Sequence, residues 1–524
     1  MEKELESPEP HVKLRNHFKT PTRDAVAAAK TCYSPRIISP ENLTDDDIAE
    51  VGKTTYEGGH HTVYQHEMFE FELSNISRAF THDFLHTHPF YNSSQSSQRY
   101  VQLKEPRATI PPIGNGAAES TFKRAVLRSY EIYEEITNLL TDFITSQYRS
   151  KVVAERVGKK AEREIREKAM EAARYSLTIA AHTHLIHTID GVTLWRYFKM
   201  KNLTWEAERV VSRMIEEVRA VDPQFVAFAE KEGAYQIKEI PEVSLRSQVV
   251  RDGDRFAEEF DRSLEGKRSR LVGWSANAEE VIADGVKQVL GLYKSQLPDT
   301  EAIDMVLNPA KNPYLIDTVN LSIVSPLTRV LNHAQYTFKK KISHTADSQD
   351  QRHRTIPGSR PLTTAINTRK PDYLMPEMIR RCDEANQIYK EWMEELWVEK
   401  NKLLDNDVPF EYASYVLPNG LAVRFEETGS LLHLWYKFSN RSCLRAQEEI
   451  WQVTMEEISQ INETHPNLGK YLGPPCFVRR MAHHNREVTE DLGKIKYCNQ
   501  GKLYCRQPVW TFYPDVTVEN ILRV

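Results

Sequence analysis

Arg352-His353-Arg354 is the strongest candidate for binding chemistry in this sequence, and Gln349 precedes it by three positions. If the segment from His344 is helical, Gln349 and Arg352 lie on one face of the helix, where they offer an amide and a guanidinium together. Arginine suits phosphate or a planar heterocycle, because its fork donates two parallel hydrogen bonds and its plane stacks. The alternative is a solvated basic cluster that pairs with the nearby acids Asp347 and Asp350.

A second candidate lies far earlier in the chain. The segment Ser93–Tyr100 is dense in small hydroxyl side chains and ends in Arg99-Tyr100. Such a loop can present hydroxyls and backbone amides to a phosphate. The alternative is an ordinary polar turn.

The two candidates belong to a repeated pattern. His66-x-x-Phe69-x-Phe71 is followed by His82 and Leu85-His86-Thr87, and His333-x-x-Tyr336-x-Phe338 is followed by Gln349 and Arg352-His353-Arg354, at one offset of 267 without a gap. A later block recurs at an offset of 240: Ala173, Tyr175, Leu177, Leu194, Trp195 and Phe198 return as Ala413, Tyr415, Leu417, Leu434, Trp435 and Phe438. We infer a tandem duplication of a unit of roughly 200 residues. Because each copy keeps polar residues that the other has lost, the pattern predicts one composite polar site.

The elements that must position this site are both helical and extended. Residues 21–31 read as a short helix, since Pro21 opens an alanine-rich run. Residues 67–73 alternate apolar and acidic side chains, which predicts a half-buried strand, and the pattern returns near 336–338. Apolar residues at three and four spacing predict amphipathic helices over 120–150, 160–182 and 376–404.

Length and composition bound the class of protein. With 40% hydrophobic and 27% charged residues, a chain of 524 residues can bury a core in each copy. A formal charge of −5 and the lack of a basic stripe interleaved with aromatic residues argue against a nucleic-acid or protein interaction module built on the Arg-His-Arg cluster. No apolar run spans a bilayer and no secretory leader is evident, so we expect a cytoplasmic protein without membrane contact. Six cysteines are too few for a disulfide framework at this length.

Four regions are predicted from the repeat. Residues 1–240 form the first copy, a charged stretch over 241–270 connects the copies, and residues 271–473 form the second copy. A tail over 474–524 begins at Pro474-Pro475.

The pattern resembles the flavin-dependent thymidylate synthases, whose signature is Arg-His-Arg-x-x-Ser with a Gln three positions before it and a Ser-x-Arg-Tyr shortly after. Gln349 and Arg352-His353-Arg354 match the front of that motif, and Ser97, Arg99 and Tyr100 match its back. Further matches are Gly59-His60-x-Thr62-x-x-x-His66, Ala173-Arg174-x-x-Leu177, Tyr415-Val416-Leu417-Pro418, and Arg441 followed by Ala446-Gln447-x-Glu449-Ile450. Lys201 stands where Arg441 does, by the offset of 240. The likeness covers most of residues 20–225 and 310–470.

The resemblance implies an α+β fold with an antiparallel sheet flanked by long helices in each copy. It implies reductive methylation of dUMP to dTMP with methylenetetrahydrofolate as carbon donor, FAD as hydride carrier and NADPH as reductant. By the same resemblance, the cofactor-binding residues are Arg352, His353, Arg354, Thr62 and Asp190. The substrate-binding residues are Gln349, Arg352, Ser97, Gln98, Arg99 and Arg174. Arg441 or Lys201 would stabilise an anionic uracil ring as the catalytic cation.

The copies also depart from the motif. The second copy has Pro357 in the serine position of the signature, and Ser414 replaces the arginine that the first copy keeps as Arg174. Asp190 and Ser430 stand where the family has an asparagine. The alternatives are a related flavin-dependent C5 alkylation of another uridine nucleotide and a flavin- or nucleotide-binding paralogue without catalysis. Because sites in this family lie between subunits, we expect the fused chain to form a homodimer that mimics a tetramer.

Two clusters invite a metal interpretation, and neither is predicted to bind one. Cys476, His483, His484, Cys498 and Cys505 lie in the tail but lack the short Cys-x-x-Cys spacing of zinc sites, which favours buried cysteines without a ligand. His82, His86 and His88, and later His182, His184 and His187, lack carboxylates at ligand spacing. A polar lining is the predicted role of these histidines.

Overall fold

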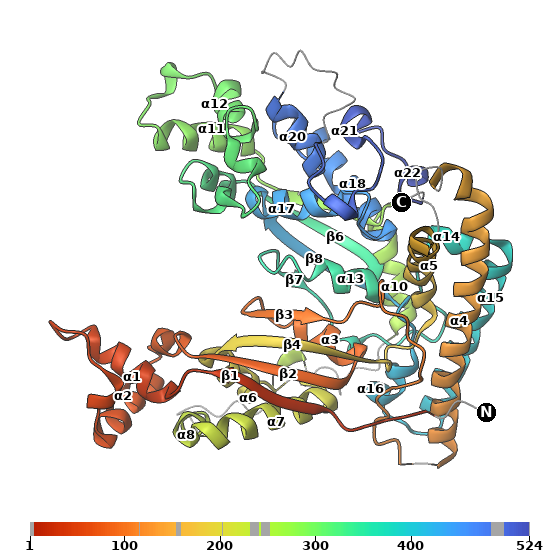
Figure 1. Cartoon of the computed structure of the whole chain (residues 1–524), viewed down its shortest axis with the longest axis horizontal. Coiled ribbons are helices and arrows are strands. Elements are labelled where there is room, and N and C mark those ends of the chain that lie inside the picture. The colour runs from red at the N-terminus through yellow and green to blue at the C-terminus, as the bar shows by residue number, and fades with distance from the viewer. Residues whose placement is uncertain are drawn as a thin grey trace.

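The computed structural model describes residues 5–114, 116–152, 159–201, 203–230, 240–242, 252–483 and 497–522. It contains two four-stranded antiparallel sheets, one in each half of the chain (Figure 1). In the first sheet, β1 (His11–His17), β2 (Met68–Ser77), β3 (Tyr91–Gln95) and β4 (His182–Asp190) lie in the order β1-β2-β4-β3. In the second, β5 (Ser269–Trp274), β6 (Gln335–Ser343), β7 (Gly358–Ser359) and β8 (Ala422–Ser430) lie in the order β5-β6-β8-β7. The predicted α+β fold of two like units is confirmed.

Each sheet buries one face against its own helices. In β2, Phe69, Phe71 and Leu73 are fully buried while Glu70 and Glu72 are not, as the alternation predicts. The first sheet packs against α6 (Gly191–Lys199), α7 (Trp205–Val221) and α8 (Pro223–Glu230). The second packs against α11 (Ala278–Val289), α12 (Asp299–Leu307), α17 (Leu431–Arg441) and α18 (Glu448–Thr464).

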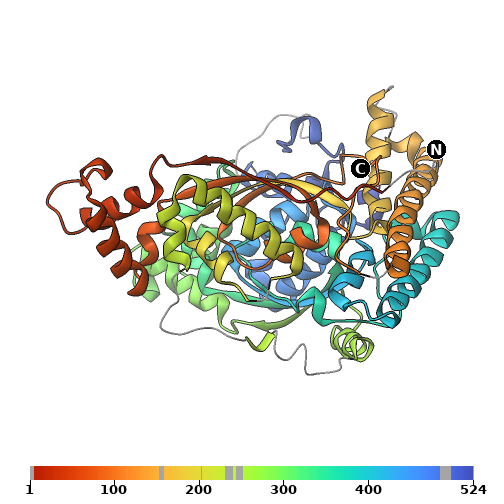
Figure 2. The same ribbon diagram turned by 90° about the horizontal axis from the view of Figure 1, so that it is seen from below.

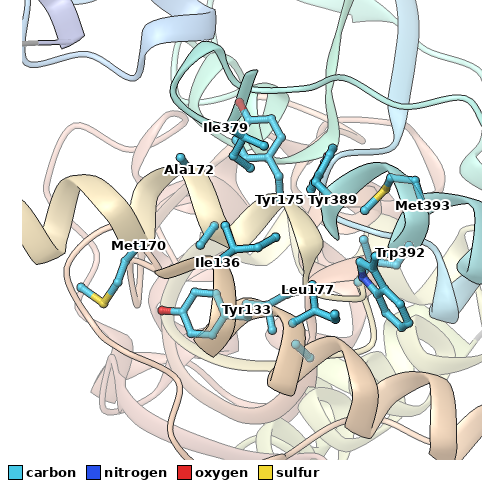
Figure 3. Close-up of a cluster of buried hydrophobic side chains, with 14 of the residues drawn as sticks. Tyr133, Ile136, Met170, Ala172, Tyr175, Leu177, Ile379, Tyr389, Trp392 and Met393 are labelled. Carbon is cyan, nitrogen blue, oxygen red and sulfur yellow. The ribbon is translucent and has the colours of Figure 1, made fainter. Parts of the chain in front are cut away.

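The long helices of both units share one apolar core at one end of the molecule (Figures 1 and 2). They are α4 (Gly116–Val152), α5 (Lys159–Ala173) and α15 (Asp383–Asp405), and the four-residue α14 (Glu377–Arg380) packs with them. Figure 3 shows Tyr133 and Met170 of the first unit in the same cluster as Tyr389 and Trp392 of the second. The predicted helix over 160–182 ends at Ala173, because the chain there turns and becomes extended to cross into the other unit. The predicted helix over 376–404 is broken between α14 and α15.

The two units exchange contacts in a reciprocal way. Ile179 N donates to Leu417 O at 2.8 Å, and Asn419 N donates to Leu177 O at 2.7 Å. At the offset of 240, Ile179 matches Asn419 and Leu177 matches Leu417. The two bonds are therefore equivalent, but the donor lies in the first unit in one bond and in the second unit in the other. The units are therefore related by an approximate twofold axis that passes close to these segments.

A β-bulge shows where the repeat pattern was wrong. The register between β2 and β4 shifts between Ser74 and Ile76, and Asn75 between them has φ +57°. This extra residue makes the offset 266 beyond the bulge, so Ser77 and Ser343, which cap α3 (Arg78–Leu85) and α13 (His344–Asp350), correspond. The counterpart of Arg352 is thus His86 rather than Leu85, and the counterpart of Gln349 is Asp83.

The remaining described helices lie at the edges of the units. They are α1 (Pro21–Thr31, as predicted), α2 (Asp45–Glu57), α10 (Gly253–Ser263), α16 (Phe410–Ala413), α19 (Pro466–Gly469), α20 (Pro475–His483), α21 (Val509–Phe512) and α22 (Val518–Leu522). Part of the predicted connection, residues 243–251, and His484 of the tail lie outside the described residues. The described part of the connection includes α10, whose Asp261 pairs with Lys341 and Arg424 of the second unit. Among the described residues, every helix is too short or too polar to cross a bilayer.

Candidate functional site

The candidate site lies where α3 of the first unit meets α13 of the second. Helix α13 ends at Asp350, with Gln351 as its C-cap, so the Arg352–Arg354 run follows the helix instead of continuing it. The expectation that Gln349 and Arg352 share one helical face is therefore wrong. The turn after α13 directs the run toward the first unit.

A cavity of about 340 Å³ opens between the units at this turn. Its walls come from the first sheet (Glu70, Tyr91, Asn92, Ser93, Ser94, Ile186 and Thr188) and from the second unit (Gln351, Arg352 and Arg354). The lining holds two guanidinium groups and four hydroxyls beside one carboxylate. A volume near the lower limit of small-molecule sites and a cationic lining favour an anionic ligand with planar or sugar parts.

Arg354 ties the two walls together. Its guanidinium donates to Asn92 Oδ1 at 2.8 Å and lies over the Tyr91 ring, 5.2 Å from the centroid. Gln351 accepts a 2.5 Å hydrogen bond from Tyr91 OH through its Oε1. These contacts hold the turn against β3 and leave Arg352 exposed at the cavity.

Arg441, the last residue of α17, lies behind this wall. Its Nε donates to His353 Nε2 at 3.1 Å, and a terminal nitrogen donates to Gln349 O at 2.7 Å. Burial lowers the pKa of Arg441 to about 10, and repulsion from Arg99 and Arg352 acts in the same direction. Burial and then the charge of Arg441 lower the pKa of His353 to about 3, so His353 is neutral and can accept this hydrogen bond.

A buried relay of amides and hydroxyls links the two units beside Arg441. Gln447 accepts from both Arg174 of the first unit and Gln349 of the second, and it donates to Tyr175 OH. Three atoms along this surface, Arg174 Nε, Gln349 Oε1 and Gln98 Nε2, are buried and have no hydrogen-bond partner among the described residues. Orphaned groups of this kind call for a ligand or water.

Arg99 lies on the same side of the interface. It pairs with Glu171, and a terminal nitrogen donates to Arg445 O of the second unit at 2.9 Å. Burial lowers the pKa of Arg99, but the charge of Glu171 outweighs it and the net shift is upward. Gln98 accepts from Asn419 Nδ2 at 3.1 Å, and Ser97 Oγ accepts from Arg99 N at 3.2 Å. The hydroxyl–arginine segment therefore lies against the second unit.

Beneath the turn, five charged residues of the second unit are buried together. Lys340 Nζ lies 2.9 Å from Asp350, 2.7 Å from Glu427 and 2.7 Å from Glu457, and Lys437 reaches the same three acids. Burial raises the pKa of Asp350, yet the two ammonium groups outweigh it and the pKa is lowered. Because Asp350 directly precedes Gln351, this network fixes the start of the Arg352–Arg354 turn.

Three predicted site residues do not join the cluster. Lys201 is exposed just past the end of α6, whereas Arg441 is still helical and inside the interface. Thr62 is exposed in a short 3-10 turn, His61–Gln65, before β2. Asp190 follows Thr188 on the cavity-lining face of β4, but its carboxylate accepts from Thr193 N and caps α6.

Sequence reasoning missed several site residues. Tyr91 and Thr188 carry no motif signal, because only the strand pairing brings them to the cavity. A group of four cysteines also comes together in the fold: Cys443, Cys476, Cys498 and Cys505. Burial raises the pKa of Cys443, Cys476 and Cys505, and the neighbouring cysteines raise it further. Cys443 lies outside the tail and joins the group only through the fold.

Comparison with known proteins defines the class. A family model described as thymidylate synthase complementing protein matches residues 13–224 and 270–467. Because these segments make up most of the chain and coincide with the two sheet-containing units, the chain belongs to this family. The duplication inferred from the repeat is confirmed by the two separate matches.

The relatives named in this family are flavin-dependent thymidylate synthases. The one from Clostridium tetani is 29% identical over 225 residues, 42% of this chain and 86% of that protein. The one from Sulfurisphaera tokodaii is 32% identical over 230 residues, 42% of this chain and 84% of that protein. The solved structure of the UMP/dUMP methylase PolB from Streptomyces cacaoi, bound with 5-Br dUMP, is 16% identical, covers 43% of this chain and 96% of that chain, and has a TM-score of 0.34. The family match and the names of the two relatives confirm the enzyme class expected from the sequence, flavin-dependent thymidylate synthase.

Proposed function

We propose that this chain catalyses the FAD-dependent reductive methylation of dUMP to dTMP, with methylenetetrahydrofolate as carbon donor and NADPH as reductant. Family membership and the names of the relatives support the reaction. The observation that carries the site is the convergence of Arg99 and Arg174 from the first unit with Arg352 and Arg441 from the second. Four guanidinium groups at one interface favour an anionic substrate that both units hold.

The nucleotide would lie on the side of Arg99 and Arg174. Ser97 and Arg99 present a hydroxyl and a guanidinium suited to a phosphate, and the unpartnered Nε of Arg174 and Nε2 of Gln98 are donors for sugar or phosphate oxygens. Gln349 Oε1, an unpartnered acceptor, suits an N–H group of the pyrimidine. Arg441 remains protonated at neutral pH despite its lowered pKa, so it stabilises negative charge on the ring and does not deliver a proton.

The residues of the 340 Å³ cavity between the units suit the phosphate and sugar parts of a flavin nucleotide. Arg352 and Arg354 offer guanidinium groups for the pyrophosphate, and Ser93, Ser94 and Thr188 offer hydroxyls. Neutral His353 accepts a hydrogen bond from Arg441, and this bond would fix the wall that lies between the flavin and the nucleotide. FAD, when bound, supplies the hydride transfer, and the protein supplies binding, orientation and electrostatics.

The twofold relation predicts one such site per chain. At the equivalent position His86 replaces Arg352, Ser414 replaces Arg174, and Lys201 replaces Arg441. The guanidinium set is thus complete on one side of the axis only. We therefore expect one FAD and one dUMP per chain in equilibrium titrations.

The decisive experiment is dUMP-dependent reoxidation of the reduced flavin in the presence of methylenetetrahydrofolate. Loss of one charged donor from a preorganised site costs roughly 100-fold or more in rate, so Arg352→Ala and Arg441→Gln should fall by at least about that factor. The exposed Arg329 provides a charge-matched control, and Arg329→Ala should retain the wild-type rate. Lys201→Ala should also stay active, which would leave Arg441 as the catalytic cation.

Three outcomes would contradict the proposal. Turnover that is unchanged in Arg352→Ala would refute the site. FAD and dUMP binding without turnover in the wild-type chain would instead identify a binding paralogue. Turnover with another uridine nucleotide in place of dUMP would identify a related C5 alkylation.

We also propose that the chain forms a homodimer. Matching loops of both units, between α1 and α2 and between α11 and α12, carry exposed apolar side chains: Tyr33 is 94% and Ile37 89% exposed in the first, and Tyr293 is 67% exposed in the second. Equivalent apolar tips on both units suit a second copy that repeats the approximate twofold symmetry. Light scattering should give twice the chain mass of 60.7 kDa, and a monomer in the active fractions would contradict it.

A further inference from the structure

Three side chains from the two units meet at one buried point between α3 and α13. His82 Nε2 lies 3.0 Å from Asp347 Oδ2, and His86 Nε2 lies 3.2 Å from the same oxygen. His82 and His86 are four residues apart, so they share one face of α3. Their side chains are 4% and 7% exposed, and that of Asp347 is fully buried.

The hydrogen bonds on the far side of each ring define which nitrogen faces the carboxylate. His82 Nδ1 lies 3.3 Å from Asp83 Oδ1, and His86 Nδ1 lies 2.5 Å from His82 O. Both neighbours are acceptors, so each Nδ1 can donate to its neighbour while Nε2 faces Asp347. His86 Nε2 is buried without a hydrogen-bond partner among the described residues. A divalent cation at this point would accept the lone pairs of both Nε2 atoms and neutralise the charge on Asp347 Oδ2, in place of an Nε2–H hydrogen bond to that oxygen. A ring nitrogen bound to a carboxylate or carbonyl while the other faces inward is the usual second shell of a metal-bound histidine.

The spacing of the three atoms suits a metal ion. Bonds of about 2.0–2.1 Å to imidazole nitrogen and carboxylate oxygen in tetrahedral geometry separate the ligand atoms by roughly 3.3 Å. The two nitrogen–oxygen distances are close to that value, and all three ligand atoms lie within 4.8 Å of one another. Arg360 donates to both oxygens of Asp347 at 2.8 and 2.7 Å and so holds the carboxylate in place.

We propose that His82, His86 and Asp347 bind a divalent first-row transition-metal ion of the Zn²⁺ class, which joins the two units at the position where the second nucleotide site has been lost. Two histidines and a carboxylate leave one coordination position open. A cavity of about 50 Å³ bordered by His82 and Arg360 has room for water in that position. The neighbouring His344, stacked on His82 with ring centroids 4.2 Å apart, has both ring nitrogens buried without a hydrogen-bond partner among the described residues.

The spacing along the chain predicts no metal at these histidines, because it shows no carboxylate at ligand spacing in the same segment. The fold supplies the carboxylate from the other unit, 265 positions away. At the twofold-related position Thr81 replaces Asp347 and Gln95 replaces Arg360, and these two form a neutral hydrogen bond of 3.0 Å. The charged cluster therefore arose on one side of the axis only.

The test measures Zn²⁺ and Co²⁺ binding to the full-length chain after treatment with a chelator. One equivalent of Zn²⁺ should bind and raise the melting temperature, since the ion holds two units of the folded chain. The bound Co²⁺ should show the visible absorption bands of nitrogen and oxygen ligands. It should lack the near-ultraviolet thiolate bands that binding at the group of four cysteines (Cys443, Cys476, Cys498 and Cys505) would give. His86→Gln and Asp347→Asn should each weaken Zn²⁺ binding at least about 100-fold, and Asp83→Asn about 10-fold.

The exposed His184 on β4 provides the matched control, and His184→Gln should bind Zn²⁺ as the wild type does. If Asp347→Asn fails to fold, Asp347→Thr restores the residue of the twofold-related position and serves in its place. Wild-type chain that binds neither ion would overturn the proposal. Binding that is equal in the His86 and Asp347 variants, or a Co²⁺ spectrum with thiolate bands alone, would also overturn it.

Discussion

The buried charges beneath the Arg352–Arg354 turn permit a sharp test of how the second unit is held together. Lys340 contacts all three acids of the network, while its counterpart in the first unit is the buried Leu73. The counterpart of Glu457 is Met214, also fully buried. The same fold therefore accepts either charges or apolar side chains at these positions, and the perturbation is Lys340→Met alone and together with Glu457→Met.

The expected magnitudes follow from which charges remain. Lys340→Met leaves Asp350, Glu427 and Glu457 with only Lys437, and removal of one partner of a buried ion group costs about 3–5 kcal/mol. In the double variant one positive and one negative charge have left together, with side chains of similar length in their place. We expect the double variant to recover at least about 2 kcal/mol, a coupling typical of contacting charges.

Urea unfolding of the two single variants, the double variant and the wild type gives the coupling free energy. Tryptophan emission reports on the second unit through Trp435 and Trp451, which are buried in it. FAD affinity should fall with stability in Lys340→Met, because Asp350 no longer fixes the turn, and should return in the double variant. A coupling below about 0.5 kcal/mol, or a loss under 1 kcal/mol in Lys340→Met, would refute this reasoning.

Three further predictions concern single side chains. Burial lowers the pKa of His187 from 6.5 to about 3, so the unfolded chain binds a proton that the folded chain does not. The stability that neutral, buried His187 contributes is complete above pH 6.5 and is lost as the pH falls toward 3. Between pH 7.5 and 5, the free energy of unfolding measured in urea should fall by about 2 kcal/mol more in the wild type than in His187→Gln. Equal losses in the two proteins would contradict this prediction. Tyr415→Phe removes a 2.9 Å bond to Glu206 of the other unit and should cost about 1–2 kcal/mol in the same assay, whereas an unchanged midpoint would show that the bond adds nothing. Arg354→Lys keeps the charge but loses the planar contact with Tyr91, so FAD affinity should drop about tenfold by fluorescence titration; an unchanged affinity would remove Arg354 from the cofactor site.

Much of the local structure could be predicted because it depends on neighbours in the chain. The alternation of Phe69 and Phe71 with Glu70 predicted β2, and Pro21 before alanines predicted α1, since period and capping are properties of short segments. Repeated spacing predicted two like units. The offset of 267 is wrong beyond Asn75, because one bulged residue changes the offset without changing the residue types around it.

The sequence by itself determined the two units, their strands and helices, and the guanidinium and hydroxyl groups available for a nucleotide. Only the tertiary structure decided which of those groups meet: Arg441 enters the interface while Lys201 stays exposed, and Asp347 faces His82 and His86 across it. The physical reason is that these contacts depend on how distant segments approach one another in space. Arg441 bonds His353 and Gln349, far away in the sequence of its own unit, and Asp347 gains both histidines by the approach of the other unit. Packing of the shared helical core fixes that approach, and no spacing along the chain encodes it.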